Sequence, residues 1–287
     1  RDHSIEDIPV IMISSDDSKD IIRRAFERGV SDYINRPFDA RTVYRRAFNT
    51  IRLYAKQRRL VRMVSAQTRK QEHNTTMLVN VLSQIVEFRN GESGSHVRHI
   101  RILTEKIMAQ LLRKTDKYSL SSEEQDNITL ASALHDIGKI AIDEKILNKP
   151  GRLTPEEFAV IKTHTTEGAA LLHRLENFDT EPLLQTACDI ARWHHERWDG
   201  RGYPDGLAGD DIPIGAQLVS LADVYDALTS ERCYKKAFPH EKAVQMILGG
   251  ECGTFNPLLL ECLKDIEGSL QAELKKDYQS DPAELEV

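Results

Sequence analysis

The chain has 287 residues, of which 40% are hydrophobic and 29% charged, and its formal net charge is −6. This length allows two domains or one large one, and the apolar content is sufficient for buried cores. The acidic balance argues against DNA or an acidic membrane as a partner. No apolar run approaches the roughly 20 residues that span a bilayer, the four cysteines form no CxxC pair, and the first residues do not resemble a signal peptide. We therefore expect a cytoplasmic globular protein with reduced thiols.

The first 50 residues alternate short apolar runs with a helical pattern. Residues 8–15, IPVIMISS, form a β-branched run typical of a strand in a parallel sheet. The amphipathic pattern of residues 18–29 predicts a helix that ends at Gly29, and residues 30–38 predict a second strand closed by a proline. Another helix is expected from about Ala40, so this region predicts an α/β unit.

This unit resembles the second half of a response-regulator receiver domain. Ser14 occupies the position of the family's switch Ser or Thr, and Arg36-Pro37 that of its Lys-Pro. The arginine departs from the family pattern, and the phosphate-accepting aspartate of the family lies on an earlier strand. We therefore expect residues 1–50 to be the carboxy-terminal part of a receiver from a longer protein, with a degenerate receiver as the alternative. A complete receiver would imply an upstream histidine kinase as a partner.

A basic stretch follows, with no acidic residue between Arg41 and Lys70. A nucleic-acid-binding arm would explain its charge, but aromatic stacking platforms are missing. We favour a long amphipathic helix with a solvated positive face, acting as a helical linker over residues 51–76. Its apolar positions continue into residues 77–88, MLVNVLSQIVEF. The pattern indicates a possible homodimer through the linker helix.

Histidines and carboxylates recur through the remaining two-thirds of the chain. Such ligands, without a thiolate, suit iron, manganese or zinc better than a sulfur-rich structural zinc site. They exceed the needs of one ion and predict two or three ions that share bridging carboxylates, as in phosphodiester hydrolysis. Other histidines, which lie outside the pattern, are interpreted as ordinary surface or packing residues. The candidates are Glu92 and His96 at i and i+4, the doublets His135-Asp136 and His194-His195, and the single residues His164 and Asp223.

The segments HDIGK, residues 135–139, and HHERWDGRGYPDGL, residues 194–207, resemble the two signatures of the HD-GYP family. The resemblance covers roughly residues 77–263 and includes ILNKPGRLTPEE and ADVYDALTSERCYKKA. It implies a metal-dependent phosphodiesterase that hydrolyses cyclic di-GMP to the linear dinucleotide or on to GMP. The predicted fold class is mainly α: an all-helical HD-superfamily catalytic domain, preceded by part of an α/β receiver domain and a long linking helix.

The resemblance also assigns roles to single residues. It implies two or three divalent ions, most often iron or manganese, and catalytic roles for Asp136 and Lys139. Lys139, Arg232 and Lys235 would contact substrate phosphates. Gly202, Tyr203 and Pro204 would shape a loop beside the site, where an ordinary surface turn is the alternative interpretation. The implied metal ligands are Glu92, His96, His135, Asp136, His164, His194, His195 and Asp223.

The predicted catalytic domain covers residues 77–268, and the charged, proline-broken segment 269–287 is expected to be a disordered polar tail. Gln217 is a mild departure, because relatives often carry an arginine there. Two alternative functions stay open. A noncatalytic regulator could bind a cyclic dinucleotide or a protein partner through the same surface, and an HD-type hydrolase could act on mononucleotides, although the GYP loop argues against the latter.

Overall fold

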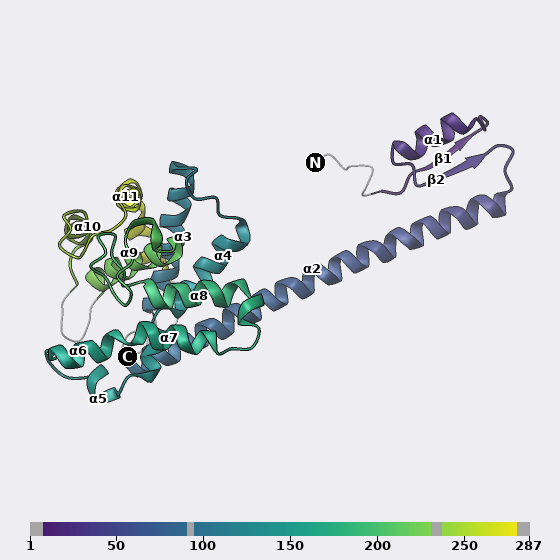
Figure 1. The fold of residues 1–287 in the computed structure, drawn as a ribbon. Coiled ribbons are helices and arrows are strands. Elements are labelled where there is room, and N and C mark those ends of the chain that lie inside the picture. The colour runs from purple at the N-terminus through teal and green to yellow at the C-terminus, as the bar shows by residue number, and fades with distance from the viewer. Residues whose placement is uncertain (1–7, 91–94, 231–236, 280–287) are drawn as a thin grey trace. The chain divides into compact units, whose positions relative to one another are not determined.

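The computed structural model describes residues 8–90, 95–230 and 237–279 (Figure 1). Three residues with predicted roles, Glu92, Arg232 and Lys235, lie outside these ranges. The chain divides into two compact units, Arg1–Thr75 and Thr76–Val287, each of which is described by itself. No helix among the described residues combines the length and apolar character needed to cross a membrane.

The first unit contains a parallel pair of strands, β1 (Ile11–Ser14) and β2 (Asp32–Asn35), joined by helix α1 (Lys19–Glu27). Helix α1 ends as the sequence predicts, because Gly29 adopts a φ of 84°, in the left-handed region that glycine enters at little cost. The predicted order of strand, helix, strand and helix is confirmed.

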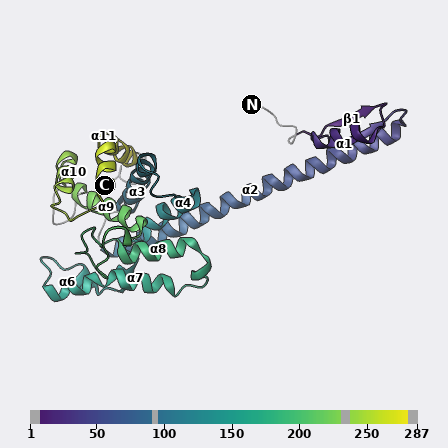
Figure 2. The ribbon, with the colours of Figure 1, turned by 45° about the horizontal axis from the view of Figure 1, so that its top comes forward.

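Helix α2 (Ala40–Asn90) is one uninterrupted helix of 51 residues (Figure 2). It begins after Asp39, whose carboxylate accepts a hydrogen bond from the Thr42 amide at 2.9 Å, the usual arrangement at a helix start. Its basic stretch is solvent-exposed, as expected for a linker. Burial is confined to its last turns, at Val79, Ser83, Val86 and Glu87.

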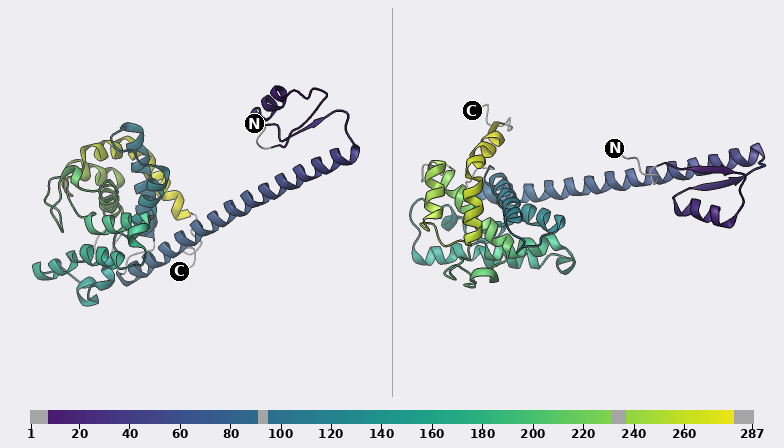
Figure 3. Two further views of the ribbon diagram at one scale, coloured as in Figure 1. Left: turned by 45° about the vertical axis from the view of Figure 1, so that its right-hand side comes forward. Right: turned by 90° about the horizontal axis from the view of Figure 1, so that it is seen from above.

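The second unit is all-helical in its described residues, which confirms the predicted fold class. An isolated bridge between Asp199 and Ala208 is its only extended pairing there. Helix α11 packs along α3 (Figure 3) and continues to Gln279. The prediction of a disordered polar tail from residue 269 is therefore wrong for residues 269–279, because Leu270 and Leu274 are buried in the core. The helices are α3 (Ser95–Lys114), α4 (Ser122–Ala131), α5 (Glu144–Leu147), α6 (Pro155–Lys162), α7 (His164–His173), α8 (Pro182–Trp193), α9 (Ile214–Thr229), α10 (His240–Leu248) and α11 (Pro257–Gln279), with short 3-10 helices η2 (Ser132–Leu134), η3 (Ile137–Ala141), η4 (Phe178–Thr180) and η5 (Gly209–Asp211).

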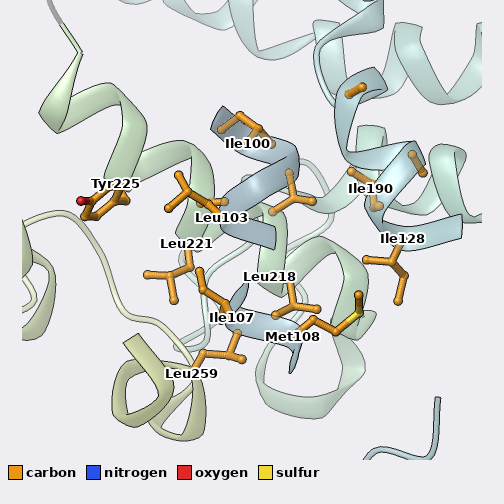
Figure 4. Close-up of a cluster of buried hydrophobic side chains, with 14 of the residues drawn as sticks. Ile100, Leu103, Ile107, Met108, Ile128, Ile190, Leu218, Leu221, Tyr225 and Leu259 are labelled. Atoms are coloured by element: carbon orange, nitrogen blue, oxygen red, sulfur yellow. The ribbon is translucent and has the colours of Figure 1, made fainter. Parts of the chain in front are cut away.

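The core of this unit lies between α3 and α9 (Figure 4). Ile100, Leu103 and Ile107 recur at helical spacing on α3 and are fully buried, as are Leu218 and Leu221 on α9. Burying an aliphatic side chain of this size contributes about 1.5–3 kcal/mol. This packing fixes the two helices that carry His96 and Asp223.

A second set of local signals places α6 and α7. Thr154 and Glu157 form a reciprocal capping box, and Pro155 occupies the first turn of α6. Helix α6 ends at Lys162, and His164 begins α7 after a single intervening residue. Lys162, at the carboxyl end of α6, and His164, at the amino end of α7, therefore both lie at the junction of the two helices.

Candidate metal centre

The HDIGK segment begins directly after one short 3-10 turn, η2, and continues into the next, η3, instead of lying on a regular helix. His135 and Asp136 stand between these turns. Gly138 allows η3 to lie directly on the start of α7: a Cβ there would sit 1.9 Å from the His164 carbonyl oxygen and 2.4 Å from the Gly168 nitrogen. Only glycine permits this approach, which brings Asp136 to the His164 imidazole.

The structure gathers six of the eight predicted ligands into two groups. The potential ligand atoms within each group all lie within 4.8 Å of one another. The groups draw on α3, α7 and α9, on the residues directly after α8 and on the turn between η2 and η3, so they come from segments far apart in the sequence. One group is His164, His194 and His195, and the other is His96, His135 and Asp223.

Asp136, the seventh predicted ligand, lies between the two groups. Its Oδ1 is 3.3 Å from His164 Nε2 and 3.9 Å from His194 Nε2. Its other oxygen, Oδ2, is 3.3 Å from His135 Nε2. A carboxylate that faces both groups in this way is suited to bridge two cations. The eighth predicted ligand, Glu92, lies outside the described residues.

Three of these imidazoles are oriented by main-chain carbonyl groups. The Nδ1 atoms of His135, His164 and His194 lie 2.9, 2.8 and 3.0 Å from the carbonyl oxygens of Ser132, Ile161 and Ile190. Because a carbonyl oxygen only accepts, each Nδ1 carries the proton and each Nε2 keeps a lone pair. Within the described residues, the buried Nε2 of His135 has no hydrogen-bond partner. This donor set fits a divalent metal, which takes neutral imidazole nitrogen and carboxylate oxygen.

Burial and neighbouring charges set the protonation of the site. Burial, reinforced by the nearby His135 and His164, lowers the pKa of His194 to about 3. Burial also lowers the pKa values of His164 and His195, so these imidazoles are neutral and able to bind a cation. For His135 burial acts in the same direction, but the Asp136 carboxylate outweighs it and raises the pKa.

The Asp136 carboxylate is ionised. Burial acts to raise its pKa, but the Lys139 ammonium and the His135 imidazole outweigh burial and hold the pKa well below its usual range. Lys139 Nζ lies 2.7 Å from Asp136 Oδ2. The two residues with predicted catalytic roles are therefore in contact, with the ammonium beside the carboxylate that faces both groups.

Asp226 is a residue of the site that the sequence analysis missed. Its Oδ2 lies 2.6 Å from His96 Nδ1 and its Oδ1 lies 2.7 Å from His99 Nδ1. Burial acts to raise the pKa of Asp226, but these two hydrogen bonds outweigh it and hold the pKa below its usual value. His99, which lies outside the predicted ligand set, is buried and shares this carboxylate. The available signal was spacing, because Asp226 follows Asp223 by three positions and His99 follows His96 by three.

The GYP loop folds back onto the second histidine doublet. The Tyr203 ring stacks on the His195 ring, with centroids 4.8 Å apart and planes inclined by 29°. A Cβ on Gly202 would lie 2.4 Å from the Glu196 Cα, so glycine is required for this close approach. Gly202 and Tyr203 therefore pack against the segment that carries the histidine doublet, whereas an ordinary surface turn would make no such contacts.

Polar contacts hold the far side of the loop. Glu196, buried and also missed by the sequence analysis, accepts hydrogen bonds from the amides of Asp205 at 2.7 Å and Gly206 at 2.9 Å. Asp205 in turn accepts hydrogen bonds from Arg192 Nε at 2.7 Å and Trp193 Nε1 at 2.8 Å. These contacts fix the loop after Pro204 relative to α8.

Gln217 has a structural role away from the metal ligands. Its amide group donates a hydrogen bond to the Ile212 carbonyl at 2.7 Å and accepts one from Asn256 at 2.9 Å. The residue is buried, so both bonds are needed to satisfy its polar atoms. Glutamine at this position therefore ties α9 to the start of α11.

Comparisons with known proteins agree with this geometry. A family model described as an HD domain matches residues 80–252. The chain is 36% identical to a probable cyclic di-GMP phosphodiesterase of Vibrio cholerae, over 89% of this chain and 60% of the relative. It is 34% identical to a cyclic di-GMP phosphodiesterase response regulator of Xanthomonas campestris, over 94% of this chain and 70% of the relative. A cyclic di-GMP phosphodiesterase of Thermotoga maritima is 31% identical, with coverages of 95% and 75%.

These similarities differ in extent. The chain spans 60% of the length of the Vibrio cholerae relative, so it corresponds to a part of that protein. The HD-domain match, by contrast, includes both groups of potential ligands and Asp136. HD domains bind divalent metals, in agreement with the donor set found here. The chain belongs to the HD-domain family.

Proposed function

We propose that this chain is an HD-GYP-type phosphodiesterase that hydrolyses cyclic di-GMP with two or three divalent ions, iron or manganese. The observation that carries the proposal is Asp136, which lies between two groups of imidazole and carboxylate ligands. Ions held on either side of a shared carboxylate would neutralise a phosphodiester and lower the pKa of a bound water to near 7. The names of the relatives support cyclic di-GMP as the substrate.

The chain's own residues have distinct tasks in this proposal. Asp136 would bind the ions of both ligand groups through its two oxygens. The main-chain carbonyls keep the imidazoles in the tautomer that binds metal. Lys139 contributes positive charge next to the bridging carboxylate, where it would stabilise the charge that develops on phosphate. Tyr203 closes the site on the His195 side. Arg232 and Lys235 are proposed to hold phosphates, on sequence grounds alone.

Glu92 decides between two ions and three. We assign one ion to His164, His194 and His195, and a second to His135 and Asp223, with Asp136 shared between them. A further ion is assigned to Glu92 together with His96, whose Nδ1 is held by Asp226 and whose Nε2 can bind a single ion. Glu92→Gln keeps the side-chain size and removes the anionic ligand, so it should lower the metal content by about one ion per chain. Linear dinucleotide should then accumulate, while part of the first cleavage survives. Unchanged metal content and an unchanged product ratio would instead leave a two-metal enzyme.

The first unit and helix α2 are proposed to make this enzyme the output of a response regulator. The proposed boundaries are residues 1–50 for the receiver part, 51–76 for the linker and 77–268 for the catalytic domain, to which the rest of α11, up to Gln279, is added. A relative named as a response regulator supports this role, and a histidine kinase would act upstream. Exposed apolar side chains on α2, including Leu53, Leu60 and Val64, support a homodimer through this helix.

The test uses the full chain, loaded anaerobically with iron or manganese and incubated with cyclic di-GMP. Chromatography should show linear dinucleotide, GMP or both. Asp136→Ala should abolish turnover and reduce metal content, whereas Lys139→Ala should retain the metals and lower the rate. Binding of cyclic di-GMP without any product would favour the noncatalytic regulator, and cleavage of mononucleotides alone would favour the general HD-type hydrolase.

A further inference from the structure

A separate cavity of about 230 Å³ lies beside the metal centre. Lys162 contributes from the end of α6, and Arg197, Arg201 and Tyr203 contribute from the loop after α8. His195 lines it too, so one residue belongs both to this cavity and to the first ligand group. The cavity therefore adjoins the site already described, but its other lining residues are not candidate metal ligands.

The cations that line the cavity are poorly neutralised. Lys162 Nζ lies 4.9 Å from the centre of the Phe158 ring and 5.1 Å from that of the Tyr203 ring. Across the described ranges, no carboxylate reaches ion-pair distance of Lys162 or Arg197. Arg201 has only a long contact of 4.0 Å to Asp199 and is 82% exposed. In the described ranges, the Asp199 carboxylate is the one acidic group that interacts with both arginines, and it can offset only part of the three positive charges. In a chain with a net charge of −6, this local excess of positive charge is unusual.

The one carboxylate on the lining does not neutralise these cations. Glu196 directs Oε1 to the amides of Asp205 and Gly206, where it holds the GYP loop. The Arg197 guanidinium instead packs over Gly253, with Nε 3.2 Å from the position a Cβ would take. The lining therefore has a net positive charge. The GYP loop and the segment around Gly253 support it through these contacts.

Size and charge together select the ligand. At about 230 Å³ the cavity is smaller than the roughly 300–1,000 Å³ that enclose a drug-sized ligand, so it fits one phosphate with part of a nucleoside and excludes a complete cyclic dinucleotide. A phosphomonoester carries about −1.5 to −2 charges at pH 7. A phosphodiester carries a single negative charge, so a cavity with excess positive charge should bind a phosphomonoester more tightly than a phosphodiester.

The proposed reaction creates such a group. Hydrolysis of one diester of cyclic di-GMP breaks a bond between phosphorus and the 3′ oxygen; water supplies hydroxide to phosphorus and a proton to the 3′ oxygen. The product is a linear dinucleotide with a terminal 5′-phosphomonoester and one remaining diester. We propose that the cavity bounded by Lys162, Arg197 and Arg201 binds this terminal phosphomonoester and thereby positions the remaining diester for the second cleavage. This inference rests on the proposed function.

The test compares Lys162→Gln and Arg197→Gln with the wild-type chain, all loaded with metal. Lys264→Gln removes the same charge from an exposed position on α11 and is the matched control. Each cavity variant should raise KM for the linear dinucleotide about tenfold with a much smaller change in kcat, and raise KM for cyclic di-GMP less than threefold. Lys162→Arg, which keeps the charge, should restore most of the affinity. The control should behave as wild type with both substrates.

A binding measurement separates this proposal from the proposed function. Titration calorimetry with 5′-GMP and with guanosine should show that the glutamine variants weaken 5′-GMP binding about tenfold and leave guanosine binding unchanged. Unchanged affinity for 5′-GMP in both variants, or equal rises of KM for the linear and cyclic substrates, would overturn the cavity assignment. If the wild-type chain fails to cleave cyclic di-GMP while the variants still lose 5′-GMP affinity, the proposed function is wrong and the anion site stands.

Discussion

Asp226 illustrates how a carboxylate that is not itself a candidate ligand can control a metal site. Both of its oxygens accept hydrogen bonds, one from His96 and one from His99. Asp226→Asn replaces one acceptor by a donor, so at least one of these imidazoles loses its orientation. We expect metal affinity to fall by about 10- to 100-fold, as is typical when the partner of a ligating histidine is removed. Metal titration measures this without reference to turnover, and an unchanged affinity would show that Asp226 only packs the core.

Asp189 on α8 predicts a pH dependence of stability that is independent of the metal ligands. Burial raises its pKa to about 6, against about 3.9 for an unfolded chain. Because the pKa of this carboxyl is higher in the folded state than in the unfolded chain, the protonated form favours folding. Its contribution to stability is therefore fully present below about pH 4 and is lost as the pH rises through about 6.

Asp189→Asn should therefore raise the free energy of unfolding at pH 7.5 by about 1 kcal/mol, a value reduced for the partial exposure of the side chain. The gain should shrink at pH 5, where the folded carboxyl is largely protonated. Urea denaturation of both proteins at the two pH values, with equal metal loading, measures the difference. A gain that is the same at both pH values would contradict the assigned cause.

At the scale of an element, helix α2 carries an apolar stripe with the period of a coiled coil. Leu53, Leu60 and Val64 are 64%, 53% and 64% exposed, although each is a large aliphatic side chain. Alternating steps of three and four residues continue from Leu53 to Phe88, the mean spacing of 3.5 that keeps a seam facing a partner helix. A second copy of α2 would cover this stripe. The apolar members are Leu53, Leu60, Val64, Leu78, Val81, Ile85 and Phe88, with Gln57, Gln67, Gln71 and Asn74 between them.

The double substitution of Leu60 and Val64 by Asp should convert a dimer into a monomer, because paired carboxylates would face each other in the seam. Ser65→Asp adds charge outside the seam and serves as the control. Sedimentation velocity at equal concentrations distinguishes the species. A wild-type chain that is monomeric at every accessible concentration would refute the dimer.

Sequence periodicity predicts the elements well where each depends on its own residues. The strand, helix, strand and helix of the first unit follow from local patterns, and Gly29 ends α1 as expected. Six ligands could be identified from the sequence because their motifs are distinctive, and the structure brings these six residues together in two groups. Glu196 was missed although it lies within the second signature, because its bonds to the amides of Asp205 and Gly206 depend on how the loop folds back. Asp226 was missed because its bond to His96 depends on the approach of α9 to α3. The spacing of three from Asp223 could have marked Asp226 as a candidate, but the 130 positions that separate it from His96 hide which residue it contacts.

For the molecule as a whole, metal binding should join helices that are distant along the chain. Ligands come from α3, the turn between η2 and η3, α7, the residues directly after α8, and α9. Ions that bind only the folded state stabilise it by about 4 kcal/mol when free metal is 1,000 times Kd. At about 2–4 °C per kcal/mol, chelation should lower the melting temperature of the second unit by about 10 °C.

Differential scanning calorimetry before and after chelation measures this change. Asp136→Ala, which lacks the bridging carboxylate, should show a much smaller response to the chelator. The described part of the first unit holds none of the ligands, so a transition assigned to that unit should not move. A chelator-independent transition in the wild-type second unit would show that the ions contribute little to its folding.

The contact of Gly138 with the main chain of α7 has a consequence for genetic screens. No side chain at position 138 can be accommodated unless the backbone of His164 moves. A screen that scores only turnover would therefore rank Gly138 with the ligands, although it contributes no functional group. Loss of activity at this position reports on the spacing between two backbones, and a screen that also scored protein abundance and bound metal would separate that spacing defect from a chemical one.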